Sequence, residues 1–249
     1  MIHLVRARER HFSDFDWLKT YWLFSFAEYY DPSNIQFGPL RVFNDDVVEP
    51  GTGFPTHPHR EMEIITIPLN GEITHADSMG NRTVIRAGDV QRMSAGTGLT
   101  HSEYNRGQSP VHFYQIWIHP DERGIPPSYD QRQFDPASWR NRLRPVASGR
   151  GVPDVVTFHA DATVYRADMD RDTTLTHWAG ENHRVFLYLT HGALVLDQYE
   201  LGPGDQARID DAPELRLKAA SASGLLLIDL PSNRGFGYDP ATLRGTKVT

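Results

Sequence analysis

The chain has 249 residues, with 25 Lys and Arg against 32 Asp and Glu, and a net charge of −7 at pH 7. This acidic balance argues against direct binding to nucleic acid, because phosphate contacts require clustered Lys and Arg. Cysteine is absent, which excludes disulfides, thiolate metal ligands and cysteine nucleophiles. The sequence shows no signal peptide and no apolar run long enough to span a bilayer, so we expect a cytoplasmic protein without a membrane partner.

Turn residues interrupt the sequence about every 8 to 12 residues, a spacing typical of antiparallel strands joined by turns. Strand-like runs lie between the turns at 63–69, 83–86 and 111–118. The state of residues 15–29 stays open, because this aromatic-rich segment shows only weak helical periodicity. The sequence therefore predicts an all-β protein with few short helices.

The second half of the chain repeats the pattern of the first half. The similar segments are 63–69 and 185–190, 70–71 and 191–192, and 85–89 and 201–205. Between the halves, residues 121–153 are rich in Pro, Arg, Asp and Gly, with one helix-like stretch in which Asp135 can cap and Pro136 can occupy the first turn. Two β-sandwich or barrel units joined by this segment are the simplest interpretation.

Four candidate metal ligands arrive as two short pairs, His57 with His59 and His101 with Glu103. In a β-strand, residues two apart share a face, so each pair can direct both side chains at one point. Three neutral imidazoles and one carboxylate suit iron, nickel, copper or zinc, whereas magnesium and calcium prefer oxygen ligands. The spacing predicts a transition-metal site.

Other polar residues near these pairs receive simpler interpretations. Glu63 lies four residues past His59 and shares its strand face if no bulge intervenes, where it can support a ligating imidazole. His75 and Asp77 also form a same-face pair, but a role at a hairpin tip is favoured because a turn follows at 77–81. The later histidines are set apart because they lack the two-residue spacing; they are His177, His183 and His191.

Two sets of residues resemble the conserved motifs of the cupins. Gly51, His57, His59, Glu63 and Gly71 resemble the first motif, and Gly88, Gly96, His101 and Asn105 resemble the second. The sequence departs from the general pattern at three places. The interval from Glu63 to Gly71 is one residue longer, Ser94 replaces a usual proline, and His101 comes two residues late.

These departures resemble one branch of the cupins, the pirins. The similar segments are 24–27, 30–32, 41–46, 54–59, 77–81, 93–98, 101–105 and 115–118. The similarity is dense from Trp17 to Ile118 and looser beyond Asp121, and the chain resembles most the bacterial pirin-like proteins with quercetin 2,3-dioxygenase activity. The resemblance implies a bicupin, with two jelly-roll barrels and one metal in the N-terminal barrel.

The resemblance also implies domain bounds and a ligand set. We expect a metal-binding cupin domain at 1–122, a linker with a short helix at 123–153, and a metal-free cupin domain at 154–249 that includes a tail at 234–249. The implied ligands are His57, His59, His101 and Glu103, with Glu63 in a supporting position. Fe(II) is the expected ion, with Cu, Ni, Zn and Mn as alternatives.

The activity implied is ring-opening of a flavonol such as quercetin by O₂, with release of carbon monoxide and with Glu103 as the base. Phe54, Met93 and Phe113 are candidate walls of an apolar substrate pocket, although the same side chains can simply fill the barrel. Two alternatives remain open. One is a metal- or redox-responsive regulator that binds a protein partner; the other is a different cupin activity on a small molecule.

Overall fold

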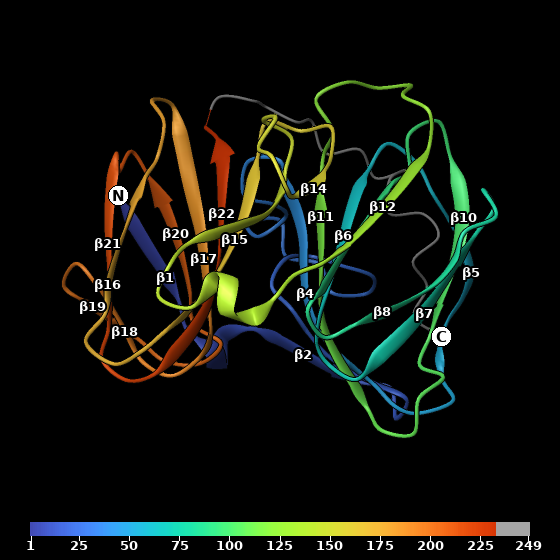
Figure 1. Ribbon diagram of the computed structural model, residues 1–249, viewed down its shortest axis with the longest axis horizontal. Helices are drawn as coiled ribbons and strands as arrows, with labels where there is room; N and C mark the ends of the chain where they lie inside the picture. The colour runs from blue at the N-terminus through green and yellow to red at the C-terminus, as the bar shows by residue number, and fades with distance from the viewer. Residues whose placement is uncertain (233–249) are drawn as a thin grey trace. The chain divides into compact units, whose positions relative to one another are not determined.

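The computed structural model describes residues 1–232, and β-strands form nearly all of its regular structure (Figure 1). The described chain divides into two compact units. The N-terminal unit comprises residues 11–133 and 156–160. The C-terminal unit comprises residues 1–10 and 134–155 and the described chain from residue 161 onward. Within residues 1–232, no helix is both long and apolar enough to cross a membrane.

The N-terminal unit consists of two sheets that enclose a barrel interior. Its strands are β2 (His11–Asp14), β3 (Leu18–Trp22), β4 (Leu40–Val48), β5 (Gly53–His59), β6 (Glu63–Asn70), β7 (Glu72–Asp77), β8 (Arg82–Arg86), β9 (Asp89–Ser94), β10 (Leu99–Tyr104), β11 (Val111–Ile118), β12 (Ser128–Gln133) and the short β14 (Val156–Thr157). The larger sheet has the order β12-β9-β6-β11-β4-β3-β2, and the smaller has the order β5-β10-β7-β8.

The C-terminal unit has the same topology. Its elements are β1 (Ile2–Val5), the 3-10 helices η1 (Ala7–Glu9) and η2 (Pro136–Trp139), β13 (Arg144–Ser148), β15 (Thr163–Met169), β16 (Thr174–Trp178), β17 (His183–His191), β18 (Leu194–Leu196), β19 (Tyr199–Leu201), β20 (Gln206–Asp210), β21 (Glu214–Ala219) and β22 (Ser223–Pro231). The order β1-β20-β17-β22-β15-β13 matches β12-β9-β6-β11-β4-β3, and β16-β21-β18-β19 matches β5-β10-β7-β8. The predicted bicupin fold is confirmed.

Both the strands and the short helix follow the sequence pattern. The runs at 63–69, 83–86 and 111–118 form β6, β8 and β11. At η2, the Asp135 carboxylate accepts a hydrogen bond from the Ala137 amide at 2.9 Å, as expected of an N-cap. The open segment 15–29 contains β3 followed by turns.

The two units differ from the expected domains at two segments, the first ten residues and most of the expected linker. Residues 1–10 and 134–155 belong to the C-terminal unit, since β1 pairs with β20 and β13 pairs with β15. Backbone hydrogen bonds between strands distant in sequence therefore decide these boundaries, and composition does not reveal them. The expected tail at 234–249 lies outside the described residues.

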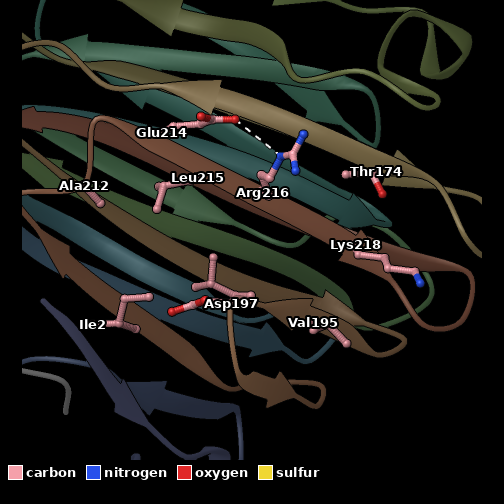
Figure 2. A pocket seen from close by; sticks show the side chains of 10 residues that line it. Ile2, Thr174, Val195, Asp197, Ala212, Glu214, Leu215, Arg216 and Lys218 are labelled. Carbon is pink, nitrogen blue, oxygen red and sulfur yellow. Dashed lines mark ion pairs between the residues drawn. The ribbon is translucent and has the colours of Figure 1, made fainter.

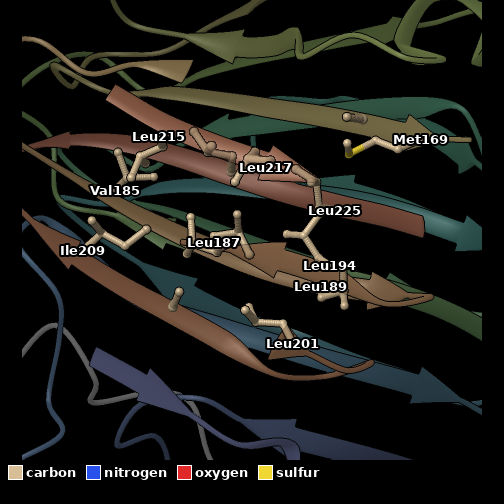
Figure 3. Close-up of a cluster of buried hydrophobic side chains, with 14 of the residues drawn as sticks. Met169, Val185, Leu187, Leu189, Leu194, Leu201, Ile209, Leu215, Leu217 and Leu225 are labelled. Atoms are coloured by element: carbon tan, nitrogen blue, oxygen red, sulfur yellow. The ribbon is translucent and has the colours of Figure 1, made fainter. Parts of the chain in front are cut away.

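Most of the buried side chains in the core of the C-terminal unit are aliphatic (Figure 3). On β21, Leu215, Leu217 and Ala219 are buried and alternate with exposed residues, the period-2 pattern of a strand with one face in the core. Each buried leucine contributes about 1.5–3 kcal/mol through removal from water. Hydrophobic packing therefore stabilises this barrel.

Candidate metal centre

The two predicted ligand pairs lie on neighbouring antiparallel strands. His57 and His59 end β5, and His101 and Glu103 lie in β10. The register places His101 directly opposite His57, and it shifts between His101 and Glu103. Strand pairing thus brings together two pairs that are about forty residues apart in sequence, as the two-residue spacing predicted.

The three imidazoles of these pairs form one cluster. Each offers a ring nitrogen within 4.8 Å of the others, and the facing Nε2 atoms of His57 and His101 are 3.0 Å apart. His57 Nδ1 donates to the Pro55 carbonyl oxygen at 2.7 Å, which leaves the Nε2 lone pair directed at His101. His59 and His101 are buried and His57 is half-buried, so the cluster has one side toward solvent.

Burial keeps the rings of His59 and His101 uncharged. Loss of solvation, with a smaller contribution from the neighbouring His57, lowers the pKa of His59 to about 3. The pKa of His101 also lies well below 6.5, mainly because of burial and then because of the adjacent imidazoles. Neutral imidazoles carry the lone pair that a metal requires, so the donor set is ready for a cation at neutral pH.

Glu103 groups with His101 and His75 rather than with the three-imidazole cluster as a whole, and two polar side chains orient it. Its carboxylate accepts a hydrogen bond from Gln115 Nε2 at 2.7 Å and a longer one from Thr66 Oγ1 at 3.4 Å. Trp117 Nε1 in turn donates to Gln115 Oε1 at 3.2 Å. An imidazole cluster with an adjacent carboxylate matches the nitrogen and oxygen ligands that divalent transition metals prefer.

His75 joins this cluster, which the hairpin-tip interpretation did not foresee. Its side chain is fully buried, and its ligand atom lies within 4.8 Å of those of His101 and Glu103. His75 Nε2 donates to Asp77 Oδ2 at 2.9 Å, while Asp77 also accepts from the turn residue Asn81. The turn role is therefore right for Asp77 and wrong for His75, because β7 directs His75 into the barrel.

The expectation that Glu63 shares a strand face with His59 is wrong. The chain turns between them, with Glu61 at a φ of 52°, so His59 ends β5 and Glu63 begins β6 in the other sheet. Glu63 is buried and accepts a hydrogen bond from Ser94 Oγ at 2.7 Å, with His159 Nδ1 at 3.4 Å. Among the described residues, its hydrogen bonds do not include a ligand imidazole.

The candidate pocket walls differ in position. Phe54 lines a small cavity beside His57 and Glu103. Met93 packs in a hydrophobic cluster with Trp22 and Trp117, and Phe113 packs in a second cluster. Neither Met93 nor Phe113 is among the residues that line this cavity.

A larger groove lies on the C-terminal unit, with a volume of about 620 Å³ (Figure 2). Its charged lining residues are exposed, and Arg216 pairs with Glu214 at 3.4 Å. In the part of the chain that the structure describes, the histidine and carboxylate groups close enough to share a metal lie in the N-terminal unit. Chemistry therefore favours the small buried site over the larger groove.

Comparisons with known proteins give a separate family match for each half of the chain. Residues 5–118 match the pirin family, and residues 145–230 match the quercetinase C-terminal cupin domain. Quercetin 2,3-dioxygenase from Escherichia coli (strain K12) is 41% identical over 93% of this chain and 99% of that protein. A pirin-like protein from Caulobacter vibrioides is 39% identical over 87% of this chain and 94% of that protein.

A solved structure extends the similarity to three dimensions. The bacterial pirin YhhW from Escherichia coli, in complex with nickel(II), has a TM-score of 0.88 and 40% identity, covering 93% of this chain and 99% of that one. Sequence identity, barrel topology and the clustered ligand pairs agree with one another. The chain belongs to the pirin family of the cupins.

Proposed function

We propose that this chain is a metal-dependent dioxygenase that opens the heterocycle of a flavonol such as quercetin with O₂ and releases carbon monoxide. One divalent transition metal is held by His57, His59, His101 and Glu103, with Fe(II) as the first expectation. The supporting observation is the cluster of neutral imidazoles beside a buried, oriented carboxylate. The relative named quercetin 2,3-dioxygenase and the nickel complex of a bacterial pirin support the same assignment.

The bound ion supplies Lewis acidity and a template for substrate and O₂. The protein supplies the proton acceptor. Glu103 accepts the proton of the flavonol hydroxyl, and the resulting oxyanion makes the ring electron-rich enough to react with O₂. A positioned base of this kind contributes about 10²- to 10⁴-fold to the rate. Because Gln115 and Thr66 hold the carboxylate in place, Glu103 is oriented before substrate binds.

Aromatic side chains surround the small cavity beside the candidate ligands. Phe54, Trp22 and Phe26 line the cavity beside His57 and Glu103. The ring of Phe54 lies 5.1 Å from that of Trp17 in an edge-on contact, and Trp22 and Phe26 pack in the same manner at 5.5 Å. The half-buried His57 lies on the side of the cluster through which a ligand reaches the metal.

Two substitutions separate metal binding from proton transfer. Glu103→Gln keeps a side chain of the same shape but removes the base, so we expect partial metal binding with turnover reduced by at least about 10²-fold. His101→Ala should lose the metal altogether. Metal content per chain and loss of flavonol absorbance measure the two effects, with His112→Ala as control, since His112 pairs with Asp45 away from the ligands.

The outcomes distinguish the alternatives. Normal turnover by Glu103→Gln would show that another group is the base. Tight metal binding by the unsubstituted protein with no flavonol turnover by any ion would favour the metal-responsive regulator or a different substrate.

A further inference from the structure

The N-terminal barrel contains a second group of possible metal ligands that overlaps the three-imidazole cluster. This inner group consists of His75 on β7 and of His101 and Glu103 on β10. Each of the three offers a ligand atom within 4.8 Å of the other two, and all three are buried. His101 also belongs to the outer group, which it forms with His57 and His59. The two groups therefore share one imidazole.

Strand pairing holds His75 beside the ligands of β10. The register places His75 opposite Glu103 and Asp77 opposite His101. The ring centroids of His75 and His101 are 5.4 Å apart, and the ring of Tyr129 on β12 lies 4.9 Å from that of His75. With 0% of its surface exposed, His75 is fixed inside the barrel next to two candidate ligands.

A carboxylate determines which nitrogen of His75 can bind an ion. Asp77 accepts hydrogen bonds from the Met79 amide and from the Asn81 side chain, both at 2.9 Å. Asp77 Oδ2 also lies 2.9 Å from His75 Nε2, and Nε2 donates because the carboxylate accepts. In the neutral ring the lone pair is then on Nδ1. Histidines that bind metals almost always donate their other N–H to a carboxylate or a carbonyl in this way.

The nitrogen left for an ion has no other partner. Within residues 1–232, the Nδ1 atoms of His75 and His101 are both buried without a hydrogen bond. Buried polar atoms are rarely left unpaired in proteins unless a ligand or an ordered water completes them. A cation held by the inner group would occupy the lone pair of His75 Nδ1.

The C-terminal barrel shows that the fold does not require a histidine on this strand. By sheet order, β18 matches β7 and β21 matches β10. The buried positions of these two strands include Leu194, Leu196, Leu217 and Ala219, which belong to the hydrophobic core (Figure 3). An aliphatic side chain therefore suits the inner face of this strand, and packing alone does not explain a buried imidazole at His75.

We propose that His75, His101 and Glu103 form a second metal position. One ion occupies either this inner position or the proposed catalytic position, because both use His101 and Glu103. Two imidazoles and one carboxylate are typical of non-haem Fe(II) sites, so the inner position takes a divalent transition metal. All three of its ligands are buried, whereas the catalytic set includes the half-buried His57. The inner position thus holds the ion without the ligand that faces solvent, and it does not depend on the proposed reaction.

Zinc binding to a variant without the outer histidines tests this position. His57→Ala combined with His59→Ala leaves the inner group complete, so we expect this double variant to bind one Zn(II) per chain. Its affinity should be at least about 10-fold below that of the unsubstituted protein, since even loss of a residue that only orients a ligand has an effect of this size. Adding His75→Leu should weaken binding at least about 10-fold further. His112→Ala in the double variant is the control, since His112 pairs with Asp45 away from both groups.

Spectroscopy separates ligation by His75 from an effect on the fold. Cu(II) bound to the double variant should show paramagnetic resonance coupling to two imidazole nitrogens, and His75→Leu should leave coupling to one. Circular dichroism of the metal-free proteins checks that each variant is folded. His57→Gln with His59→Gln provides a second form of the double variant, with polar side chains of similar length.

Two results would overturn the proposal. One is a folded double variant that binds no zinc, and the other is zinc affinity and copper coupling that stay the same when His75→Leu is added. Because neither substrate nor O₂ is present, absence of flavonol turnover would contradict the proposed function and leave this measurement intact.

Discussion

Buried ionisable side chains with opposite pKa shifts define the site at the scale of single residues. His59 remains neutral because burial lowers its pKa to about 3, and Asp46 remains protonated because burial raises its pKa to about 8. Both shifts favour the uncharged form, as expected in an interior that solvates charge poorly. Burial therefore keeps both of these side chains uncharged at neutral pH.

The His59 shift predicts that acid destabilises the metal-free protein. Below pH 6.5 an unfolded His59 takes up a proton and the folded one does not, so stability is lost as pH falls from 6.5 toward 3. Between pH 7 and pH 5 the loss should be about 2 kcal/mol. Urea unfolding of the metal-free protein and of His59→Gln measures it, and the same pH dependence in both proteins would contradict the assignment.

The raised pKa of Asp46 predicts that stability falls as pH rises, which is opposite to the effect of His59. Above pH 3.8 an unfolded Asp46 loses its proton, whereas the folded one retains it up to about pH 8, so its contribution becomes less favourable as pH rises between these values. Asp46→Asn should therefore gain about 1 to 3 kcal/mol relative to the unsubstituted protein between pH 5 and pH 7. Urea unfolding at both pH values checks this gain, and a difference independent of pH would show that Asp46 ionises normally.

At the scale of elements, the pairing of β5 with β10 positions the candidate ligands. Gly53 begins β5, and a Cβ built there would lie 2.2 Å from the Glu103 carbonyl oxygen. Only glycine allows the two backbones to approach this closely. The approach holds the His57 and His59 pair against the His101 and Glu103 pair.

Gly53→Ala should separate the strands and misplace the ligands. We expect metal affinity to fall at least about 10-fold, the effect typical of disturbed ligand orientation. Competition with a chromophoric chelator measures the change. Gly202→Ala, where the nearest atom to a new Cβ is 4.0 Å away, should bind metal normally, and equal affinity of both variants would contradict the role given to Gly53.

Alternation along a strand was enough to predict which residues share a face. It grouped His57 with His59 and His101 with Glu103, and the strands confirm both pairs. Alternation wrongly placed Glu63 on the same face as His59, because a turn at Glu61 separates their two strands. It also found the His75 and Asp77 pair but could not show which face of β7 looks into the barrel, since that depends on the opposite sheet.

Cross-strand register lies beyond what the sequence shows. Strand pairing aligns four buried polar side chains that are far apart in the chain. They are Gln91, Thr66, Gln115 and Asn44. The same limit applies to the domain bounds, since the pairing of β1 with β20 joins the first residues to the second barrel. The signal available in the sequence was polar residues inside otherwise apolar strands, such as Gln115 in β11.

At the scale of the whole molecule, two barrels of one topology have different interiors. One encloses a cluster of imidazoles and a carboxylate, and the other buries mainly aliphatic side chains together with the His177–Asp229 pair at 2.8 Å. Leu217 and Ala219 occupy buried positions of β21, the strand that matches β10. That the C-terminal barrel binds no metal stays a prediction, and its apolar interior is consistent with a stabilising role.

Leu187→Ala tests this division of roles. Loss of a fully buried leucine should reduce the free energy of unfolding by about 2–5 kcal/mol, because a cavity remains in the core. The folded variant should still bind one metal per chain. Thermal unfolding and metal analysis give the two quantities, and loss of metal from the folded variant would contradict a purely structural role for this barrel.

We propose that this chain opens flavonols at a single metal. The most direct measurement loads the metal-free protein anaerobically with Fe(II), or separately with Ni(II), Cu(II), Mn(II) or Zn(II), then adds quercetin and O₂ and measures carbon monoxide. We expect carbon monoxide release in proportion to flavonol loss, dependent on the metal and abolished by His101→Ala. Stoichiometric metal binding without carbon monoxide release by any of these ions would contradict it.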